Sequence, residues 1–218
     1  MTYADGRYGA LDIGTVTCRL LVADVEDGRI IDVDKEYAIT DLGVGVDATG
    51  RLSEAAIERV LACVDRYLEV LARYDTPEHP VRRLIAMAAS SSRDAANGPE
   101  FAARLAERGV TLAVIPGSRE AQLPFLGASS DFPGENLLVV DIGGGSTEFT
   151  LGEDERILGA VSLQMGAVRM NAQRPILKYE DYAATVEQCR RMIQRDAQGL
   201  LAFETKPEWV GVGGTMTT

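Results

Sequence analysis

The residue types that bind phosphate are concentrated in one segment, Asp141-Ile-Gly-Gly-Gly-Ser-Thr-Glu148. Three consecutive glycines remove every Cβ from a tight turn, so successive backbone N–H groups can converge on an oxyanion. One or two glycines satisfy a hairpin that only needs positive φ angles, and three of them beside two hydroxyls therefore favour phosphate binding. The candidate phosphate ligands are Gly143, Gly144, Gly145, Ser146 and Thr147.

The two acidic residues of this segment are candidates for a different role. Asp141 ends an apolar run that predicts a strand, and a carboxylate at a strand end can hold Mg²⁺ through water. The role of Glu148 stays open, because an exposed strand glutamate would give the same pattern.

Two further segments repeat the combination of glycine and hydroxyl residues in a weaker form. In Asp12-Ile-Gly-Thr-Val-Thr17, the candidate phosphate ligands are Gly14, Thr15 and Thr17, and Asp12 can share the metal. A plain turn explains this segment equally well. Gly213, Gly214 and Thr215 follow a predicted strand, and an ordinary loop is the alternative there.

Two charged side chains outside these segments could also take part in phosphate chemistry. Glu120 falls in the first turn of a helix predicted after Pro116-Gly-Ser118, where a carboxylate acts as a general base or simply favours the helix dipole. Arg93 follows a predicted buried strand, and its guanidinium can bind phosphate or pair with Asp94. The pattern leaves both assignments open. His79, the only histidine, lies in a loop between prolines, which argues against histidine triads and zinc sites.

The composition excludes several classes of partner. The 218 residues include 33 acidic and 22 basic ones, and the formal net charge of −11 opposes non-specific binding to nucleic acid or an anionic membrane. The three cysteines are far apart, so a disulfide framework is not expected. No apolar run approaches the ~20 residues of a membrane span. We therefore expect a cytoplasmic protein without nucleic-acid or membrane partners.

The hydrophobic periodicity predicts two similar α/β blocks. In the first block we expect a helix that begins after Ser53, helices at about 99–108 and 119–127, and strands at 7–12, 18–25, 29–39, 81–88 and 111–115. In the second we expect a helix at 179–201 and strands at 136–141, 148–151, 156–163 and 208–212.

An internal repeat relates the two blocks. Asp12-Ile-Gly aligns with Asp141-Ile-Gly, and the same offset places Thr17 on Ser146 and Arg19 on Glu148. Each repeat is an apolar strand, an Asp-Ile-Gly turn, a second strand, an acidic turn and a third strand. The repeat predicts two related lobes, residues 1–127 and 128–218, with a ligand in the cleft between them.

In chain order these segments resemble the motifs of a known family. The matching segments are Ala10-Leu-Asp-Ile-Gly-Thr15, Arg19-Leu-Leu-Val22, Leu42-Gly-Val-Gly-Val-Asp47, Ser92-Arg-Asp-Ala-Ala-Asn97, Ile115-Pro-Gly-Ser-Arg-Glu-Ala121, Val139-Val-Asp-Ile-Gly-Gly-Gly-Ser-Thr-Glu148 and Val212-Gly-Gly-Thr-Met-Thr-Thr218. The chain thereby resembles the exopolyphosphatase/guanosine pentaphosphate phosphohydrolase (Ppx/GppA) family of the actin-like (sugar kinase/Hsp70) superfamily. The resemblance implies an α/β fold of duplicated actin-like, ribonuclease H-like lobes, with mixed sheets and an interlobe cleft.

The same resemblance implies an enzyme that releases terminal phosphate from inorganic polyphosphate or pppGpp with Mg²⁺ or another divalent cation. Glu120 would be the base that activates water, Arg93 would contact phosphate, and Asp141 and Glu148 would serve metal or water. Arg19 joins the expected phosphate-binding residues. In-line attack on phosphorus needs mainly positioning and charge neutralisation, which such residues provide. A homodimer is compatible with this interpretation.

Three residues depart from the family pattern: Arg119 replaces an acidic residue before the base, Val16 a polar residue of the first loop, and Asp41 an arginine. They leave the substrate open and keep two alternatives, an ATP-dependent kinase or ATPase of the same superfamily and a non-catalytic sensor of polyphosphate or an alarmone. The chain also stops at Thr218, inside the third glycine segment, so we expect the second lobe to be incomplete.

Overall fold

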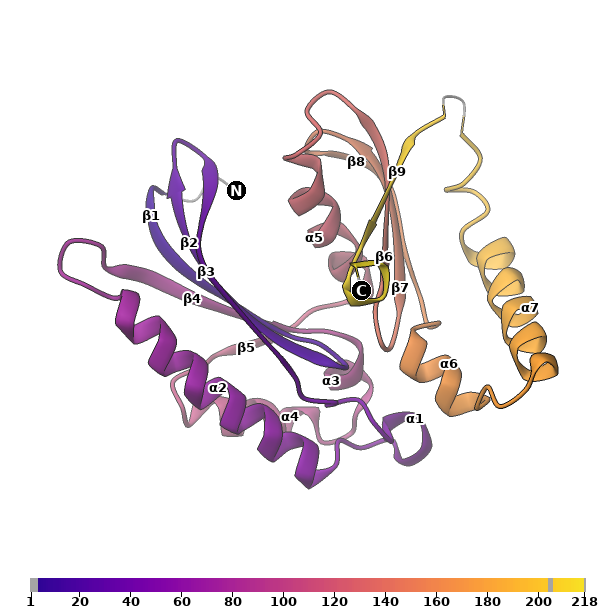
Figure 1. Cartoon of the computed structure of the whole chain (residues 1–218), viewed down its shortest axis with the longest axis horizontal. Coiled ribbons are helices and arrows are strands. Elements are labelled where there is room, and N and C mark those ends of the chain that lie inside the picture. The colour runs from indigo at the N-terminus through magenta and orange to yellow at the C-terminus, as the bar shows by residue number, and fades with distance from the viewer. Residues whose placement is uncertain (1–3, 204–205, 218) are drawn as a thin grey trace. The chain divides into compact units, whose positions relative to one another are not determined.

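The computed structural model describes residues 4–203 and 206–217 and divides into two compact units, Met1–Val114 and Ile115–Thr218 (Figure 1). Each unit is built on one β-sheet that combines antiparallel and parallel strands. In both sheets a three-stranded antiparallel meander is extended on one side by parallel pairing.

The sheet of the first unit has five strands in the order β3-β2-β1-β4-β5. The strands are β1 (Gly6–Ile13), β2 (Thr17–Glu26), β3 (Arg29–Ile39), β4 (Val81–Ala88) and β5 (Leu112–Val114). The first three pair antiparallel as a meander, and β4 and β5 continue the sheet in parallel with β1. The carboxyl ends of β1 and β4 therefore lie at the same edge of the sheet.

One long helix supplies the largest share of the core of the first unit. The helices are α1 (Val46–Thr49), α2 (Glu54–Tyr74), α3 (Ser90–Asp94) and α4 (Gly98–Ala106). The side chain of Ser53 accepts a hydrogen bond from the Ala56 N–H at 3.2 Å, which satisfies one of the free donors at the start of α2. The apolar stripe of α2, which includes Ile57, Val60 and Leu61, packs on inward-facing residues of β1 and β2.

The sheet of the second unit has four strands in the order β8-β7-β6-β9. They are β6 (Asn136–Ile142), β7 (Thr147–Glu153), β8 (Arg156–Leu163) and β9 (Glu208–Val212). The helices are α5 (Gly117–Ser129), α6 (Ala167–Gln173), α7 (Tyr179–Asp196) and α8 (Gly214–Thr217).

Helices cover both faces of this second sheet (Figure 1). Alternate residues of β6 serve the two faces: Leu137 and Val139 pack with Phe125 of α5, whereas Leu138 and Val140 pack with residues of α6 and α7. This is the side-chain alternation expected of a strand that is buried on both faces.

The predicted internal repeat is present in the strand pairing. Asp12 pairs with Arg19 across β1 and β2, and Asp141 pairs with Glu148 across β6 and β7. In each unit the first strand of the meander also takes a parallel partner, β4 in one case and β9 in the other. The predicted α/β fold with duplicated mixed sheets is confirmed.

The boundary between the units differs from the one placed at 127/128 by the sequence pattern. The compact units divide at Val114/Ile115 because α5 packs on β6, β7 and β8 of the second sheet. Helix α7 ends at Asp196, earlier than the predicted Leu201. The short helices α1, α3, α6 and α8 were not predicted, since four to seven residues show no clear helical period. No helix in the described part of the chain is both long and apolar enough to cross a membrane.

Candidate active site

The three glycines of the second unit form the turn between β6 and β7, and their carbonyl groups are all engaged by the segment that follows β8. The Gly166 N–H donates to the Gly145 carbonyl at 3.2 Å, and the Ala167 N–H donates to the Gly143 carbonyl at 3.0 Å. The Gly144 carbonyl accepts from both Val168 and Arg169, at the start of α6. The start of α6 therefore holds the glycine turn from its carbonyl side.

Two further contacts fix this turn. The Arg169 side chain donates from Nε to the Gly145 carbonyl at 2.7 Å. A Cβ on Gly166 would lie only 2.3 Å from the Gly144 carbonyl carbon, so the chain passes too close for any side chain there. Within the described residues, the N–H groups of Gly144 and Gly145 donate to no protein acceptor. Such donors, held in place and still available, are what an anion-binding turn needs.

The turn between β1 and β2 in the first unit has the same hydrogen bonding. The Gly14 N–H donates to the Thr17 carbonyl at 2.8 Å, as the Gly143 N–H donates to the Ser146 carbonyl at 3.0 Å. A Cβ on either glycine would lie 3.1 to 3.2 Å from that carbonyl oxygen. Neither Gly14 nor Gly143 has a φ in the left-handed region, so close approach rather than positive φ favours glycine.

The segment after β3 holds this first turn by its carbonyl groups, as α6 does in the second unit. The Thr40 and Asp41 N–H groups donate to the Val16 carbonyl at 2.8 and 2.9 Å, and the Gly43 N–H donates to the Thr15 carbonyl at 2.9 Å. Val16, one of the departures from the family pattern, therefore contributes through its backbone. The Thr15 hydroxyl also lies 3.1 Å from the Ser90 hydroxyl at the start of α3.

Glu148 and Glu120 bring two carboxylates together in the second unit. Glu148 is only 3% exposed, so it is not the exposed strand glutamate that the sequence left as an alternative. It accepts a hydrogen bond from the Ser162 hydroxyl at 2.7 Å, and Glu120 accepts one from the Ser146 hydroxyl at 3.3 Å. Ser146 belongs to the glycine turn, and it therefore links this acidic pair to the candidate phosphate site.

The pKa of Glu148 is raised to about 7 from its ordinary value of 4.5. Burial is the largest cause, and the negative charge of Glu120 is the next. Hydrogen bonds from Ser162 and Ser146 favour the ionised form and lower the pKa, whereas the charge of Asp141 raises it. Two carboxylates in unlike surroundings are typical of sites that move protons.

Glu120 lies in the first turn of α5, as the sequence predicts. Its N–H and that of Arg119 both donate to the Pro116 carbonyl, at 3.0 and 2.9 Å. The Arg119 side chain is exposed and donates to the Gln122 side-chain oxygen at 3.1 Å. Glu120 therefore lies where its negative charge interacts favourably with the helix dipole, and it also contacts the glycine turn through Ser146.

Arg93 lies in α3, directly after β4. Its Nε is 3.8 Å from the Asp94 Oδ1, and its side chain is 25% exposed. The pairing with Asp94 that the sequence offered as an alternative is thus present, but it is long. Arg93 therefore lies partly exposed at the edge of the sheet where the 14–17 turn also lies.

The remaining candidate site residues lie at or near the ends of strands. Asp141 is half-buried, and its Oδ1 would lie 2.3 Å from a Cβ on Gly213, a residue with φ of 85°. Gly213 therefore passes close to the Asp141 carboxylate, whereas the side chain of Thr215 lies outside the described residues.

Asp12 and its cross-strand partner Arg19 are exposed. Thr147 is buried and donates to the Met165 carbonyl at 3.1 Å.

Three residues of this site were not predicted from the sequence: Ser162, Gly166 and Arg169. Ser162 is the cross-strand partner of Glu148, and a strand register beyond the turn cannot be read from one sequence. The one sequence feature that could have indicated the contact with the glycine turn is Gly166, a glycine that comes shortly after the third strand of this unit.

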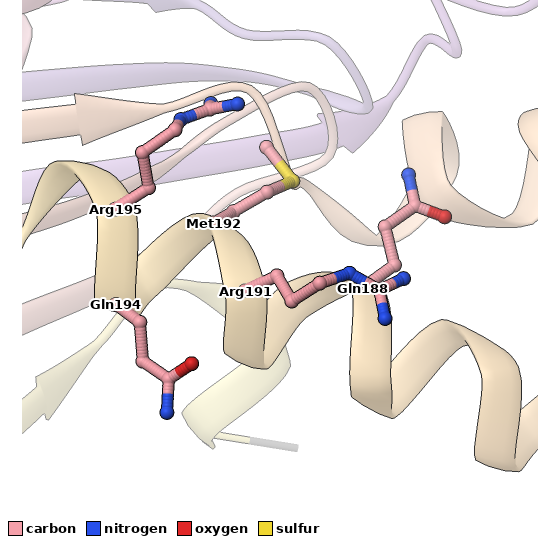
Figure 2. Close-up of a pocket in the computed structure, with 5 residues that line it drawn as sticks. All are labelled: Gln188, Arg191, Met192, Gln194 and Arg195. Atoms are coloured by element: carbon pink, nitrogen blue, oxygen red, sulfur yellow. The ribbon is translucent and has the colours of Figure 1, made fainter.

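A surface hollow of about 700 Å³ lies elsewhere, on α7, and is lined by Gln188, Arg191, Met192, Gln194 and Arg195 (Figure 2). None of the candidate site residues lines it. Arg191 and Arg195 pair with Glu187 and Asp196, at 3.3 and 2.5 Å. The hollow therefore has an ordinary charged helix surface and is no part of the candidate active site.

Comparisons with known proteins give both sequence relatives and structural neighbours of this chain. The profile of the Ppx/GppA phosphatase family matches residues 21–218. Exopolyphosphatase 2 of Mycobacterium tuberculosis is 37% identical, over 97% of this chain and 69% of that protein. Guanosine-5'-triphosphate,3'-diphosphate pyrophosphatase of Pseudoalteromonas atlantica is 29% identical, over 95% of this chain and 41% of that protein. The crystal structure of an exopolyphosphatase from Cytophaga hutchinsonii has a TM-score of 0.87 at 26% identity, over 97% of this chain and 68% of that one.

Proposed function

Because the chain belongs to the Ppx/GppA phosphatase family, we propose that it hydrolyses the terminal phosphoanhydride bond of inorganic polyphosphate, with pppGpp as the second candidate substrate. The observation that carries the proposal is the Ser146 contact, which joins Glu120 to a glycine turn with available N–H groups. The relative with the higher identity is named an exopolyphosphatase, and this favours polyphosphate over pppGpp.

We assign Glu120 as the general base. It takes a proton from the attacking water as the oxygen bonds to phosphorus and the bridging oxygen leaves with the shortened chain. The N–H groups of Gly144 and Gly145 bind the terminal phosphate and stabilise charge on its oxygens. The hydroxyl groups of Ser146 and Thr147, which the sequence offered as further phosphate ligands, are buried and donate instead to Glu120 and to the Met165 carbonyl, so they hold the turn in place. Glu148 is the second carboxylate of the pair, and its role is to orient water beside Glu120.

The donor set of the second unit fits Mg²⁺. Asp141 and Glu148 offer oxygen ligands, and Mg²⁺ commonly binds through one or two carboxylates, waters and substrate phosphates. When bound, the cation would neutralise phosphate charge. Asp12, the counterpart of Asp141 in the first unit, stays a predicted ligand.

We also assign phosphate contacts to the first unit. Gly14, Thr15 and Thr17 form a turn with the same hydrogen bonding as the glycine turn of the second unit. Arg93 has a partly exposed side chain at the same sheet edge, and a guanidinium can bind phosphate through two N–H groups. Arg19 and the Gly213–Gly214 segment with Thr215 complete the proposed set. A cytoplasmic location and a homodimer also belong to the proposal.

Phosphate release from long-chain polyphosphate, pppGpp and ATP, measured side by side with Mg²⁺, tests the proposed function. We expect polyphosphate to give the highest kcat/KM, and chelation of the cation to abolish release that added Mg²⁺ restores. Faster turnover of ATP than of polyphosphate would contradict the proposal and favour a kinase or ATPase. If the protein binds polyphosphate but does not hydrolyse it with any divalent cation, the result would favour a non-catalytic sensor.

A further inference from the structure

A buried hydroxyl on β7 contacts the helix that carries Glu120. Thr150 is 1% exposed, and its Oγ1 donates to the Ala121 carbonyl at 2.6 Å. Thr150 is two residues after Glu148 on the same strand, so both side chains face α5. The strand that presents one carboxylate of the pair therefore also holds the backbone next to the other.

Helix α5 needs such a contact at this turn because it contains Pro124. A proline has no N–H, so Pro124 cannot make the helical hydrogen bond to the carbonyl four residues earlier, which is that of Glu120. The first turn of α5 is thus less strongly held by the helix itself. The Thr150 hydroxyl binds the adjacent carbonyl and replaces part of the lost restraint.

A second contact fixes the same turn closer to its start. Ser162 is the cross-strand partner of Glu148, and a Cβ on Gly117 would lie 3.1 Å from the Ser162 Cβ and Oγ. Gly117 at the beginning of α5 therefore rests on β8 while Ala121 rests on β7. Between these two contacts the position of Glu120 is determined by the sheet.

We propose that Thr150 is a positioning residue for the reaction: its hydroxyl fixes the first turn of α5 so that Glu120 faces the glycine turn. This inference rests on the proposed function, since it assumes that Glu120 is the base. A displacement of about 1 Å in a reacting group can cost on the order of 100-fold in rate, so the contact has a measurable consequence.

The test compares Thr150→Val with Thr150→Ser in the whole chain, with polyphosphate and Mg²⁺. Valine keeps the shape and removes the hydroxyl, whereas serine keeps the hydroxyl. We expect Thr150→Val to lower kcat by about 10- to 100-fold with little change in KM, and Thr150→Ser to stay close to the wild type. Should Thr150→Val fail to fold, Thr150→Cys keeps a similar volume with a weaker donor and replaces it in the comparison.

Thr185→Val is the matched control, because Thr185 of α7 is also buried and its hydroxyl has no partner among the described residues. We expect this variant to keep the wild-type kcat. Equal losses in Thr150→Val and Thr185→Val would show a general packing effect and overturn the proposal.

A double-mutant cycle with Glu120→Gln separates positioning from loss of structure. If Thr150 acts through Glu120, Thr150→Val changes the residual kcat of Glu120→Gln by less than about two-fold, because the effects of coupled residues do not add. The same fall in both backgrounds, or a wild-type kcat in Thr150→Val, overturns the inference and leaves the proposed function intact. An unchanged kcat in Glu120→Gln alone instead contradicts the role of Glu120 in the proposed function.

Discussion

Glu148 and Glu120 have the same chemistry but different surroundings. Glu148 is buried on β7 under α5 and receives a short hydrogen bond from Ser162, whereas Glu120 is half-buried at a helix start beside Ser146. Burial therefore makes Glu148 harder to ionise than an ordinary glutamate. The raised pKa of Glu148 should affect the stability of the protein as well as its catalysis, and both effects can be measured.

Replacement of Glu148 by glutamine is expected to stabilise the metal-free protein at alkaline pH. The folded pKa of about 7 lies above the unfolded value, so the contribution of Glu148 to stability is full below the unfolded pKa and is lost as pH rises through about 7. Above that range the difference corresponds to about 3 kcal/mol. Thermal unfolding with a chelator should give Glu148→Gln a higher Tm than the wild type at pH 8 and no such advantage at pH 4.

The matched control for that measurement is Glu153→Gln, at the exposed end of the same strand. Its Tm should follow that of the wild type at both pH values. A Tm for Glu148→Gln below the wild type at pH 8 would contradict the proposed cost of ionising this carboxyl.

Arg93→Lys tests the proposed phosphate contact of the first unit. Lysine keeps the charge but loses the planar pair of donors, so we expect kcat/KM for polyphosphate to fall by about 10- to 100-fold. Arg83→Lys, an exposed residue on β4, is the control and should behave as the wild type. Equal kinetics for the two variants would remove Arg93 from the proposed site.

The elements of each unit act together at the two turns. Each turn is closed by one N–H bond from its first glycine, and its carbonyl groups are held by the segment that follows the third strand. The donors that face away from that segment are thereby fixed in direction. A preformed site of this kind loses little entropy when an anion binds.

Gly166→Ala should disturb the glycine turn without changing any proposed ligand. The added Cβ would lie 2.3 Å from the Gly144 carbonyl carbon, which is backbone and cannot move aside cheaply. We expect KM for polyphosphate to rise by about ten-fold or more, as preorganised donors are displaced. Gly127→Ala in α5, where a Cβ meets nothing within 4 Å, is the control. A KM that stays at the wild-type value in Gly166→Ala would argue against this role of α6.

The sequence predicted the long elements and missed the contacts between them. Strands and the α2 helix follow clear hydrophobic periods, so they were predicted close to their observed bounds. The role of α6 was not predicted, because its seven residues hold the glycine turn largely through backbone groups that any sequence carries. The burial of Glu148 depends on how α5 packs, and this also moved the unit boundary to Val114/Ile115.

At the scale of the whole chain, duplication explains why two weak sequence signals were informative together. The turn at residues 14–17 alone resembles an ordinary hairpin, but its hydrogen bonds repeat those of the glycine turn in the second unit. The family was predicted from seven motifs in order, and the match over residues 21–218 confirms it. The substrate could not be read from those motifs, because polyphosphate and pppGpp present the same terminal phosphates.

Phosphate release from long-chain polyphosphate by Glu120→Gln, with Mg²⁺ and saturating substrate, tests the central claim most directly. Glutamine has nearly the shape of glutamate but cannot accept the proton from water, and we expect kcat to fall by about 10²- to 10⁴-fold. Glu135→Gln, an exposed loop residue, is the control and should retain the wild-type rate. A Glu120→Gln variant that folds normally and releases phosphate at the wild-type rate would contradict the account.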